Sequence, residues 1–441
     1  MDVELQILKH LSRDAQPTVS FIDKYCNYYK NLFPEVRSYE CFKYLHLGIV
    51  SEIKRKSLPE MAKAVGLKSA QSLHHFISTS PWSVTELKRR RLSRTLEALK
   101  GNSITVVIDE TGDRKKGKRT DYVARQYLGS IGKIDSGIVS VNAYGIYQNI
   151  TFPLMFKVFK PKVRLKEGDR YQTKIELASE IIRELIDFGF KIELVLADSL
   201  YGESSSFIKT VDKYNLPWIV AIRSNHGVWM PDEQRVRANK WHKSQRIFSN
   251  QTSETRYVRE IIFGKRSSRT YWEITIDPET LPDNSTSFVM TNLKGNIKET
   301  LGNLYGLRTW IEYGFRQSKQ ELGWHDYRLT SFPDIEKWWE VIFCVYLMIS
   351  LNSQAFGLLN QSHPTNSEIK NPTADFSIHQ QWNHEVGWKN VLNNLRLIIQ
   401  PTILLWLISP WLDIFPNHYL LLGLHDLIHV MNQFQSYFPD G

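Results

Sequence analysis

The sequence predicts a mixed α/β core that is interrupted by a β-rich insertion and flanked by helical regions. Three observations support this fold class. Two short aliphatic runs each end in an acidic residue, and a segment with helical periodicity lies between them. A polar and basic stretch with strand-like alternation follows, and both ends of the chain have the helical period.

Residues 1–100 are expected to form a helical region. Ser57 fits a helix N-cap, with a proline in the first turn and Glu60 as the partner of a capping box. Gly66 predicts a turn before a second helix. This pattern is typical of a helix-turn-helix at about 57–78, although an ordinary helical hairpin explains it at least as well.

The first part of the core is expected at residues 101–228. A β-branched run predicts a buried strand that delivers Asp109 at its end, and a second aliphatic run ends in Asp198 in the same way. The expected elements are strands at 103–108, 125–129, 137–147 and 192–197 and a helix at 174–188 that Gly189 ends. Strand, hairpin, helix and strand together indicate the α/β class.

The remaining chain changes character twice. Residues 232–269 hold ten Lys or Arg against four acids, within a polar stretch bounded by prolines. A strongly periodic helix is then expected over 297–321. The expected segments are a β-rich insertion at 229–285, the second part of the core at 286–360 and a helical C-terminal region at 361–441, which opens with a polar linker.

Composition narrows the class of protein. The chain has 441 residues and a net charge of +10, and 42 % of its residues are apolar, which excludes an intrinsically disordered protein. The charge fits either a mildly basic enzyme or a protein with a polyanionic partner. Three widely spaced cysteines argue against a disulfide framework and a thiolate zinc site.

The sequence gives little evidence for a signal peptide or a membrane-spanning segment. The N-terminus has no apolar run behind a basic region, as a signal peptide would. The two most apolar stretches are 341–351, which is short for a bilayer, and 397–415, which prolines and an aspartate interrupt. We therefore expect a cytoplasmic protein.

Four residues in the helix after the insertion share a spacing. Tyr305, Arg308, Glu312 and Lys319 are three, four and seven residues apart, which places them along one face of a helix. That face presents one carboxylate among two cations and a phenol. A surface helix with an Arg308–Glu312 pair would explain two of these residues and leave the other two unexplained.

With these motifs the sequence resembles the DDE transposases of bacterial insertion sequences. The helix matches the group marked by Tyr-x2-Arg-x3-Glu-x6-Lys without a gap. The segment VVIDETGDRKKG resembles the first catalytic strand of that group, and LADSLYG resembles its Asp-x-x-Tyr-Gly segment. The resemblance covers residues 103–330 and extends only loosely to the flanks.

The resemblance implies an RNase H-like core in which Asp109, Asp198 and Glu312 hold two Mg²⁺ ions, for which Mn²⁺ can substitute. Carboxylates from separate elements suit such a hard cation better than His or Cys does, and two ions can promote an in-line phosphodiester displacement. By the same resemblance, Tyr305 and Arg308 contact the DNA backbone near the cleaved end, and Lys319 holds a nearby phosphate.

Further DNA contacts are expected from basic and aromatic residues. A basic run lies within ten residues of Asp109, where a substrate phosphate must sit, and it contains Lys115, Lys116, Lys118 and Arg119. The resembled group stacks a flipped base on an aromatic side chain of the insertion, for which the candidates here are Trp229, Trp241 and Trp272. For any one tryptophan, packing in a small β-rich core is the more common role.

The sequence thus predicts a cut-and-paste DNA transposase that cleaves transposon ends and joins them to target DNA, with hairpin ends as one route. Its expected partners are double-stranded DNA, namely the terminal inverted repeats and the target, and a second copy of the chain. We expect no membrane partner and no small-molecule substrate. We expect the protein to associate with the bacterial nucleoid. The alternatives are a catalytically retired, transposase-derived DNA-binding protein and an RNase H-like metal-dependent nuclease.

Overall fold

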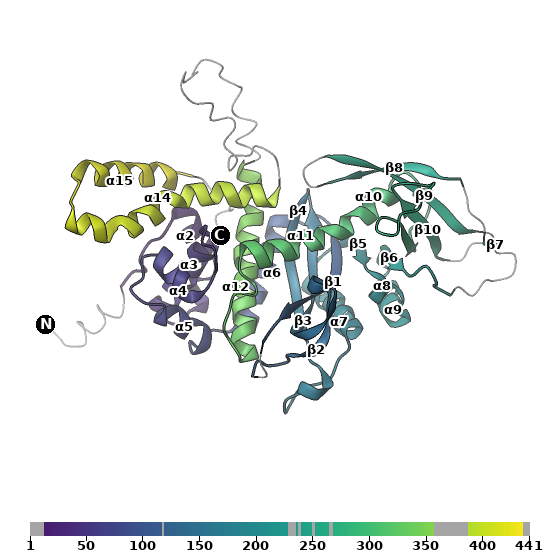
Figure 1. Ribbon diagram of the computed structural model, residues 1–441, viewed down its shortest axis with the longest axis horizontal. Coiled ribbons are helices and arrows are strands. Elements are labelled where there is room, and N and C mark those ends of the chain that lie inside the picture. The colour runs from purple at the N-terminus through teal and green to yellow at the C-terminus, as the bar shows by residue number, and fades with distance from the viewer. Residues whose placement is uncertain are drawn as a thin grey trace, which may run out of the picture. The chain divides into compact units, whose positions relative to one another are not determined.

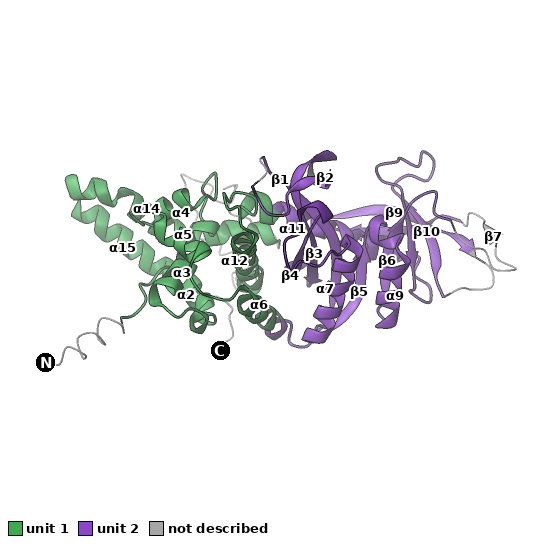
Figure 2. Ribbon diagram, turned by 90° about the horizontal axis from the view of Figure 1, so that it is seen from below, with its two compact units in different colours: residues 1–95, 317–441 green, residues 96–316 purple. Residues whose placement is uncertain are grey.

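The computed structural model describes residues 13–116, 119–227, 235–236, 240–248, 252–263, 268–356 and 387–434. The chain forms two compact units, which Figure 2 colours separately. One unit comprises residues 96–316 and contains the sheet. The other combines residues 1–95 with 317–441 and is helical. The segment 317–360, which the sequence analysis assigned to the core, therefore lies in the helical unit.

The sheet unit is built on five strands with mixed directions. The hairpin β3–β4 lies antiparallel beside β1, and β5 and β6 run parallel to β1 on its other side, so the order is β4–β3–β1–β5–β6. The bounds are β1 Ile104–Arg114, β3 Lys133–Tyr147, β4 Ile150–Phe159, β5 Ile192–Ala197 and β6 Trp218–Ile222. This order is that of an RNase H-like core, and it confirms the predicted fold class.

The predicted hairpin is present, but the strand after it is an element that the sequence analysis missed. The hairpin joins β2 (Ala124–Leu128) to β3 through the single-turn helix η2 (Gly129–Ile131). β4 contains Pro153, which lacks the N–H of a regular strand residue. The register between β3 and β4 shifts between Ala143 and Tyr144, next to this proline, and β4 pairs only with β3. The proline is tolerated because it lies at an irregularity of an edge strand.

The β-rich insertion extends the core sheet instead of forming a separate domain. β11 pairs antiparallel with the outer edge of β6, and β10 and β9 follow, so one sheet continues through the insertion. The bounds are β7 Arg235–Val236, β8 His242–Ile247, β9 Ser253–Phe263, β10 Thr270–Thr275 and β11 Ser287–Thr291. This pairing covers the backbone groups that β6 would otherwise leave open.

The helix over Lys174–Phe188, α7, has the predicted bounds. Thr173 caps its N-terminus in a reciprocal capping box with Glu176, and Gly189 follows its C-terminus at a φ of 104°. Two shorter helices, α8 (Ser199–Gly202) and α9 (Ser205–Lys213), connect β5 to β6. These helices and the short single-turn helix η3 (Lys162–Arg164) complete the connections between the core strands.

The predicted long helix over 297–321 is divided into segments. α10 (Leu301–Gly306) is followed by the 3₁₀ turn η4 (Leu307–Thr309), α11 (Trp310–Arg316) and a π-helical turn, η5 (Gln317–Glu321). α11 contacts β1, β3 and β4, as Figure 1 shows. Gly314 permits this approach, because a Cβ atom there would lie 2.8 Å from the Tyr144 ring. The four signature residues therefore do not lie on one regular helix.

The helical unit surrounds one buried helix, α12. The other helices of the unit are α2, η1, α3, α4, α5, α6, α14 and α15. Their bounds are α2 Ser20–Asn27, η1 Lys30–Leu32, α3 Val36–Val50, α4 Leu58–Ala64, α5 Gln71–Ser78, α6 Val84–Leu99, α12 Phe332–Leu351, α14 Trp388–Ile414 and α15 His418–Asn432. All three cysteines are buried and unbridged, in agreement with the sequence analysis. The polar linker predicted at 361–378 lies outside the described residues.

The predicted pair of helices at 57–78 is confirmed as α4 and α5. Gly66 lies in the turn between them at a φ of +71°, a conformation that favours glycine. The predicted capping box does not form, because the Ser57 side chain makes no cap hydrogen bond and Glu60 pairs with Lys63 at 3.1 Å. α5 buries Leu73, Phe76 and Ile77 and leaves its other side exposed.

Two helices are long and apolar enough to cross a membrane by length and composition alone, α12 with its extension to Phe356 and α14. The expectation that the first apolar stretch is too short is wrong, since α12 already begins at Phe332. The apolar window of α12 is 83 % buried within the structure. The buried residues of α14 all lie between Trp388 and Ile403, and only 22 % of its apolar window is buried.

The buried charge pair of Arg91 and Glu340 gives a test of this core. Their side chains are 0 % and 1 % exposed and hydrogen-bonded to each other. Glu340→Gln removes the negative charge that faces the buried Arg91 guanidinium, so we expect a loss of about 3–5 kcal/mol in the free energy of unfolding, measured with urea. Arg89→Ala, at an exposed pair in the same helix, is the control and should barely move the midpoint. Equal, small effects of both would contradict this packing.

Candidate active site

Asp109 and Asp198 lie side by side because of the register of two parallel strands. β1 and β5 pair in parallel up to Ile108 and Ala197, so the next residue of each strand is an aspartate at the same edge. β1 does not end there, as the sequence analysis expected, but continues to Arg114 along β3. At Asp109, β1 is no longer paired with β5 but is still paired with β3. This leaves space for side chains on the β5 side of a strand that β3 holds in place.

Burial makes these two carboxylates hard to ionise together. The Asp109 side chain is 15 % exposed, and its burial raises the pKa to about 8, with a further rise from the Asp198 charge and an opposing effect of Arg308. Burial and the Glu110 charge also raise the pKa of Asp198. Two adjacent anions in this place need a positive charge near them.

The segment after β5 fixes Asp198. Its carboxylate caps α8 and accepts the backbone N–H of Leu200 at 2.9 Å. Gly202 must be glycine, because a Cβ atom there would lie 1.9 Å from the carbonyl oxygen of Ala221. These contacts explain the Asp and the Gly of the Asp-x-x-Tyr-Gly segment. Tyr201 is the remaining named residue of that segment.

Glu110 is a site residue that the sequence analysis did not single out. Lys174 donates to Glu110 at 2.8 Å, and the fully buried Tyr201 hydroxyl donates to its other oxygen at 3.2 Å. The Glu110 charge acts on Asp198 and Asp109. The sequence feature that could have indicated this role is the position of Glu110 directly after Asp109. Both residues lie within β1, which continues to Arg114.

Arg308 provides the positive charge at the site. Its guanidinium donates to Asp109 at 3.4 Å and to Glu312 at 3.3 Å, which are long bonds. Burial lowers the pKa of Arg308, but the phenol of Tyr305 and the carboxylates of Asp109, Glu312 and Asp198 outweigh it and raise the pKa. Burial raises the pKa of Tyr305, whose hydroxyl lies near Arg308 and Ser287. The structure thus brings together Tyr305, Arg308 and Glu312 of the predicted signature.

The insertion supports the helical segment that carries this arginine. α10 packs against β8 and β9. Ser244 of β8 donates to the carbonyl of Glu299 at 2.8 Å, and Arg246 donates to Thr309 at 2.7 Å, next to Arg308. The insertion therefore positions the third acid and its arginine relative to the core strands.

Two of the three predicted acidic ligands are arranged as a hard divalent cation requires. Asp109 and Asp198 offer adjacent carboxylate oxygens, which such an ion prefers. Glu312 is 56 % exposed and bonded to Arg308, and across the described ranges no group of three His, Cys, Asp or Glu side chains is close enough to hold a metal. Two of the three predicted ligands are assembled, and the third is linked to them through the guanidinium.

The other predicted DNA-binding residues differ in exposure. Lys116 and Arg119 are exposed, Lys115 is half-buried, and Lys118 lies outside the described residues. Lys319 lies in the π-helical turn η5, which belongs to the helical unit. The predicted placement of Lys319 on the face of Tyr305 assumed a regular helix, and the structure does not have one there.

Burial excludes one of the three tryptophans that the sequence analysis proposed for stacking on a flipped base. Trp272 is 3 % exposed in β10 and donates to Thr270, so it packs in the sheet and is unsuited to stack on a base. Trp241 is half-buried, with the Arg259 guanidinium 4.3 Å from its ring centroid. Trp229 lies outside the described residues.

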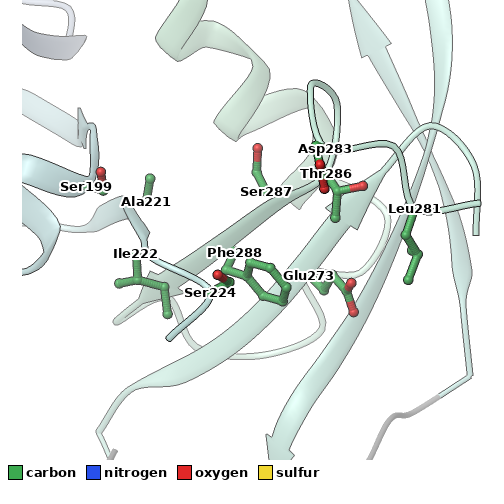
Figure 3. A pocket seen from close by; sticks show the side chains of 10 residues that line it. All are labelled: Ser199, Ala221, Ile222, Ser224, Glu273, Leu281, Asp283, Thr286, Ser287 and Phe288. Carbon is green, nitrogen blue, oxygen red and sulfur yellow. The ribbon is translucent and has the colours of Figure 1, made fainter. Parts of the chain in front are cut away.

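A cavity of about 430 Å³ lies in the sheet unit, and Figure 3 labels the residues that line it. Ser199, which follows Asp198, and Ser287, which lies near the Tyr305 hydroxyl, both line it. The ring of Phe288 and the side chains of Ile222 and Leu281 give it apolar walls. Phe288 is an accessible aromatic residue at this place that the sequence analysis did not single out.

Comparisons with known proteins agree on one family. Residues 31–255 match the family described as DDE superfamily endonuclease, and residues 165–348 match the family described as transposase DDE domain. The probable transposase for insertion sequence element IS701 from Microchaete diplosiphon is 54 % identical over 348 residues, which are 78 % of this chain and 92 % of that protein.

One solved structure is a distant match. It is the cryo-EM structure of the piggyBac transposase synaptic complex with hairpin DNA, with 10 % identity and a TM-score of 0.41 over 91 % of this chain and 77 % of that one. This likeness is too remote to add to the argument from the sheet order and the family matches.

Charge compensation at the acid pair is open to a double-mutant cycle. Arg308→Ala should lower the free energy of unfolding by about 1–3 kcal/mol in EDTA at about pH 9, above the pKa of Asp109, because it leaves two buried carboxylates uncompensated. In an Asp109→Asn background the loss should be smaller by about 1–2 kcal/mol. The control cycle with Glu312→Gln should couple more weakly, since Glu312 is 56 % exposed. Additive effects of Arg308→Ala and Asp109→Asn would contradict the assignment.

Proposed function

The chain belongs to the DDE transposases of insertion sequences, and we propose that it cuts DNA at the ends of its element and joins those ends to target DNA. Asp109, Asp198 and Glu312 are the proposed catalytic acids. The observation that carries the proposal is the parallel register of β1 and β5, which places two poorly hydrated carboxylates together beneath an arginine.

The proposed cofactor is a pair of Mg²⁺ ions, with Mn²⁺ as a substitute. Asp109 and Asp198 would hold them, with Glu312 as the third ligand. When bound, such ions activate a water or a 3′-hydroxyl and stabilise the leaving oxygen of a phosphodiester. The adjacent aspartates support this proposal, since their ionisation together is unfavourable until a cation is near.

Arg308 has a proposed role of its own. In the structure it spans Asp109 and Glu312 and partly offsets their charge. A guanidinium is well suited to a phosphate, and the Tyr305 phenol lies near it. We propose that Arg308 turns from the carboxylates to a DNA phosphate when substrate binds, and that Glu312 is then free to act with the two aspartates.

DNA binding is proposed for both units. In the sheet unit, Lys116 and Arg119 are exposed and follow the strand that carries Asp109, and Lys115 and Lys118 belong to the same run. In the helical unit, α4 and α5 are proposed to bind the terminal inverted repeats. The exposed side of α5 carries Gln71, Ser72, His74 and His75, which are side chains that can contact base edges or phosphates.

A hairpin route at the ends is also proposed. It requires a place for a flipped base near the cleaved bond. The cavity beside Asp198 offers the Phe288 ring for stacking (Figure 3), and Trp241 is the remaining described tryptophan candidate.

The C-terminal hairpin of α14 and α15 is the proposed self-association surface. Leu404, Leu407, Trp411 and Ile414 are exposed at spacings of three and four, which forms an apolar stripe along α14. α15 adds further exposed apolar residues, of which Leu420, Leu421 and Leu422 are consecutive. No Lys or Arg follows Arg396, so this surface suits neither DNA nor an anionic membrane.

A second copy of the same hairpin is a fitting occupant, because two such hairpins can bury their stripes in a four-helix bundle. A homodimer would also hold the two element ends that transposition must pair. We accordingly propose a dimer at the nucleoid, in the cytoplasm, with no membrane and no small-molecule substrate.

Cleavage by acid variants tests the proposed reaction. Asp109→Ala, Asp198→Ala and Glu312→Ala should each reduce Mg²⁺-dependent cutting of labelled element ends by about 10²–10³-fold or more, since each removes a cation ligand. End binding, followed by gel shift, should persist. Glu279→Ala, at an exposed acid of the sheet unit, is the matched control and should cut normally.

The same assay separates the alternatives. Wild-type protein that binds ends without cutting them would identify a retired DNA-binding protein. Cutting at DNA junctions without joining of ends would identify an RNase H-like nuclease. Normal cutting by any of the three acid variants would remove that residue from the proposed site.

Light scattering tests the dimer surface. Leu407→Glu with Leu422→Glu places charges on side chains that are 58 % and 47 % exposed, so the fold should tolerate them. We expect the mass to fall from dimer to monomer and paired-end complexes to disappear. Val163→Glu, at an apolar residue 84 % exposed in the sheet unit, is the control. A variant that stays dimeric would exclude this surface.

A further inference from the structure

A second cavity, of about 740 Å³, lies within the helical unit. Its walls come from the first turns of α4 and α5 and from the segment Asp326–Leu329, which precedes α12. Leu58, Leu329 and Tyr327 make much of its surface apolar. The backbone N–H of Lys56 donates to the Asp326 carboxylate at 2.8 Å and ties two of these walls together. The volume is in the range of pockets that hold a ligand of nucleotide size.

The charges around this cavity are unbalanced. Arg55 and Arg328 line it, are exposed, and have no ion-pair or hydrogen-bond partner among the residues that the structure describes. Its two acids are engaged elsewhere, since Glu60 pairs with Lys63 and Asp326 binds the backbone of Lys56. Two uncommitted guanidinium groups beside an apolar hollow favour a ligand with an anionic group and an apolar body.

We propose that this cavity receives one nucleotide of the DNA strand that is bound at the element end. Arg55 and Arg328 contact the phosphate, and the base or sugar enters the hollow against Leu58 and Leu329. The proposal rests on the proposed function of α4 and α5 in end binding and adds a specific subsite to it. This subsite lies in the helical unit and is separate from the cavity beside Asp198.

The position of the cavity favours a DNA strand over a free nucleotide. Gln71 and His74, both exposed on α5, stand at its edge, and α5 is the second helix of the pair that is expected to lie against DNA. A strand that follows this helix would pass the opening of the cavity. A phosphate contact alone would need only the two arginines, whereas the enclosed apolar volume indicates that more of the nucleotide enters.

Fluorescence anisotropy with the full chain and a labelled duplex from the DNA that flanks its gene tests the subsite. Ala70→Phe fills the cavity and leaves the charge unchanged, and we expect it to weaken binding by about tenfold. Arg55→Ala and Arg328→Ala should weaken it similarly and should each lower the salt dependence by about one phosphate contact. Arg37→Ala removes an exposed arginine elsewhere in the unit and should change binding by less than about twofold.

Abasic substitution along the duplex identifies the nucleotide that enters. At one position, loss of the base should weaken DNA binding by the wild type and leave DNA binding by Ala70→Phe unchanged. In that variant the added phenyl ring already keeps the base out of the cavity. Thermal melting checks that each variant is folded.

Three results would overturn the proposal. One is wild-type affinity of Ala70→Phe. Another is an effect of Arg55→Ala and Arg328→Ala no larger than that of Arg37→Ala. The last is tight binding of a free deoxynucleoside monophosphate that depends on Arg55 and does not compete with the duplex, which would assign the cavity to a free nucleotide.

Failure of the proposed catalytic function would appear elsewhere. Normal cutting by Asp109→Ala would contradict the catalytic assignment and leave these binding measurements interpretable. Loss of the subsite effects with cutting still dependent on Asp109 would contradict the subsite alone.

Discussion

The parallel pairing of β1 and β5 forces Asp109 and Asp198 to share one poorly hydrated edge of the sheet. Two carboxylates in such a place repel each other and lose much of their hydration, so the surrounding structure must supply positive charge. Arg308 supplies it directly, the N–H groups at the start of α8 supply it to Asp198, and Lys174 neutralises the neighbouring Glu110. The polar contacts of Arg308, Leu200 and Lys174 around the two aspartates follow from this requirement.

The requirement also gives the insertion a structural purpose. The arginine and the third acid come from a helical segment that changes from α to 3₁₀ and back within a few residues. Such a segment is poorly determined by its own hydrogen bonds. β8 and β9 hold it through Ser244 and Arg246, and the close contacts of Gly302 and Gly306 with these two residues leave no room for a larger side chain to intervene. The insertion is thus part of the active-site scaffold.

Local signals predicted the elements whose ends carry chemistry. The aliphatic runs before Asp109 and Asp198 and the cap and stop of α7 were all readable, because each depends on residues near in sequence. β4 was missed because Pro153 disguises a strand that only its pairing with β3 makes possible. Glu110 was not singled out because its partners, Lys174 and Tyr201, are distant in sequence. The irregular helix was misjudged because periodicity cannot register a 3₁₀ or π turn that tertiary contacts impose.

The central claim is that Asp109 and Asp198 bind the cation that catalysis requires, and a change of ligand atom tests it most directly. Asp109→Cys and Asp198→Cys replace a hard oxygen ligand with a soft sulfur, which Mg²⁺ binds poorly and Mn²⁺ tolerates better. Cutting of element ends by each folded variant should be lost in Mg²⁺ and partly recovered in Mn²⁺, while the wild type works in both. A folded variant that cuts equally well in the two ions would contradict the account.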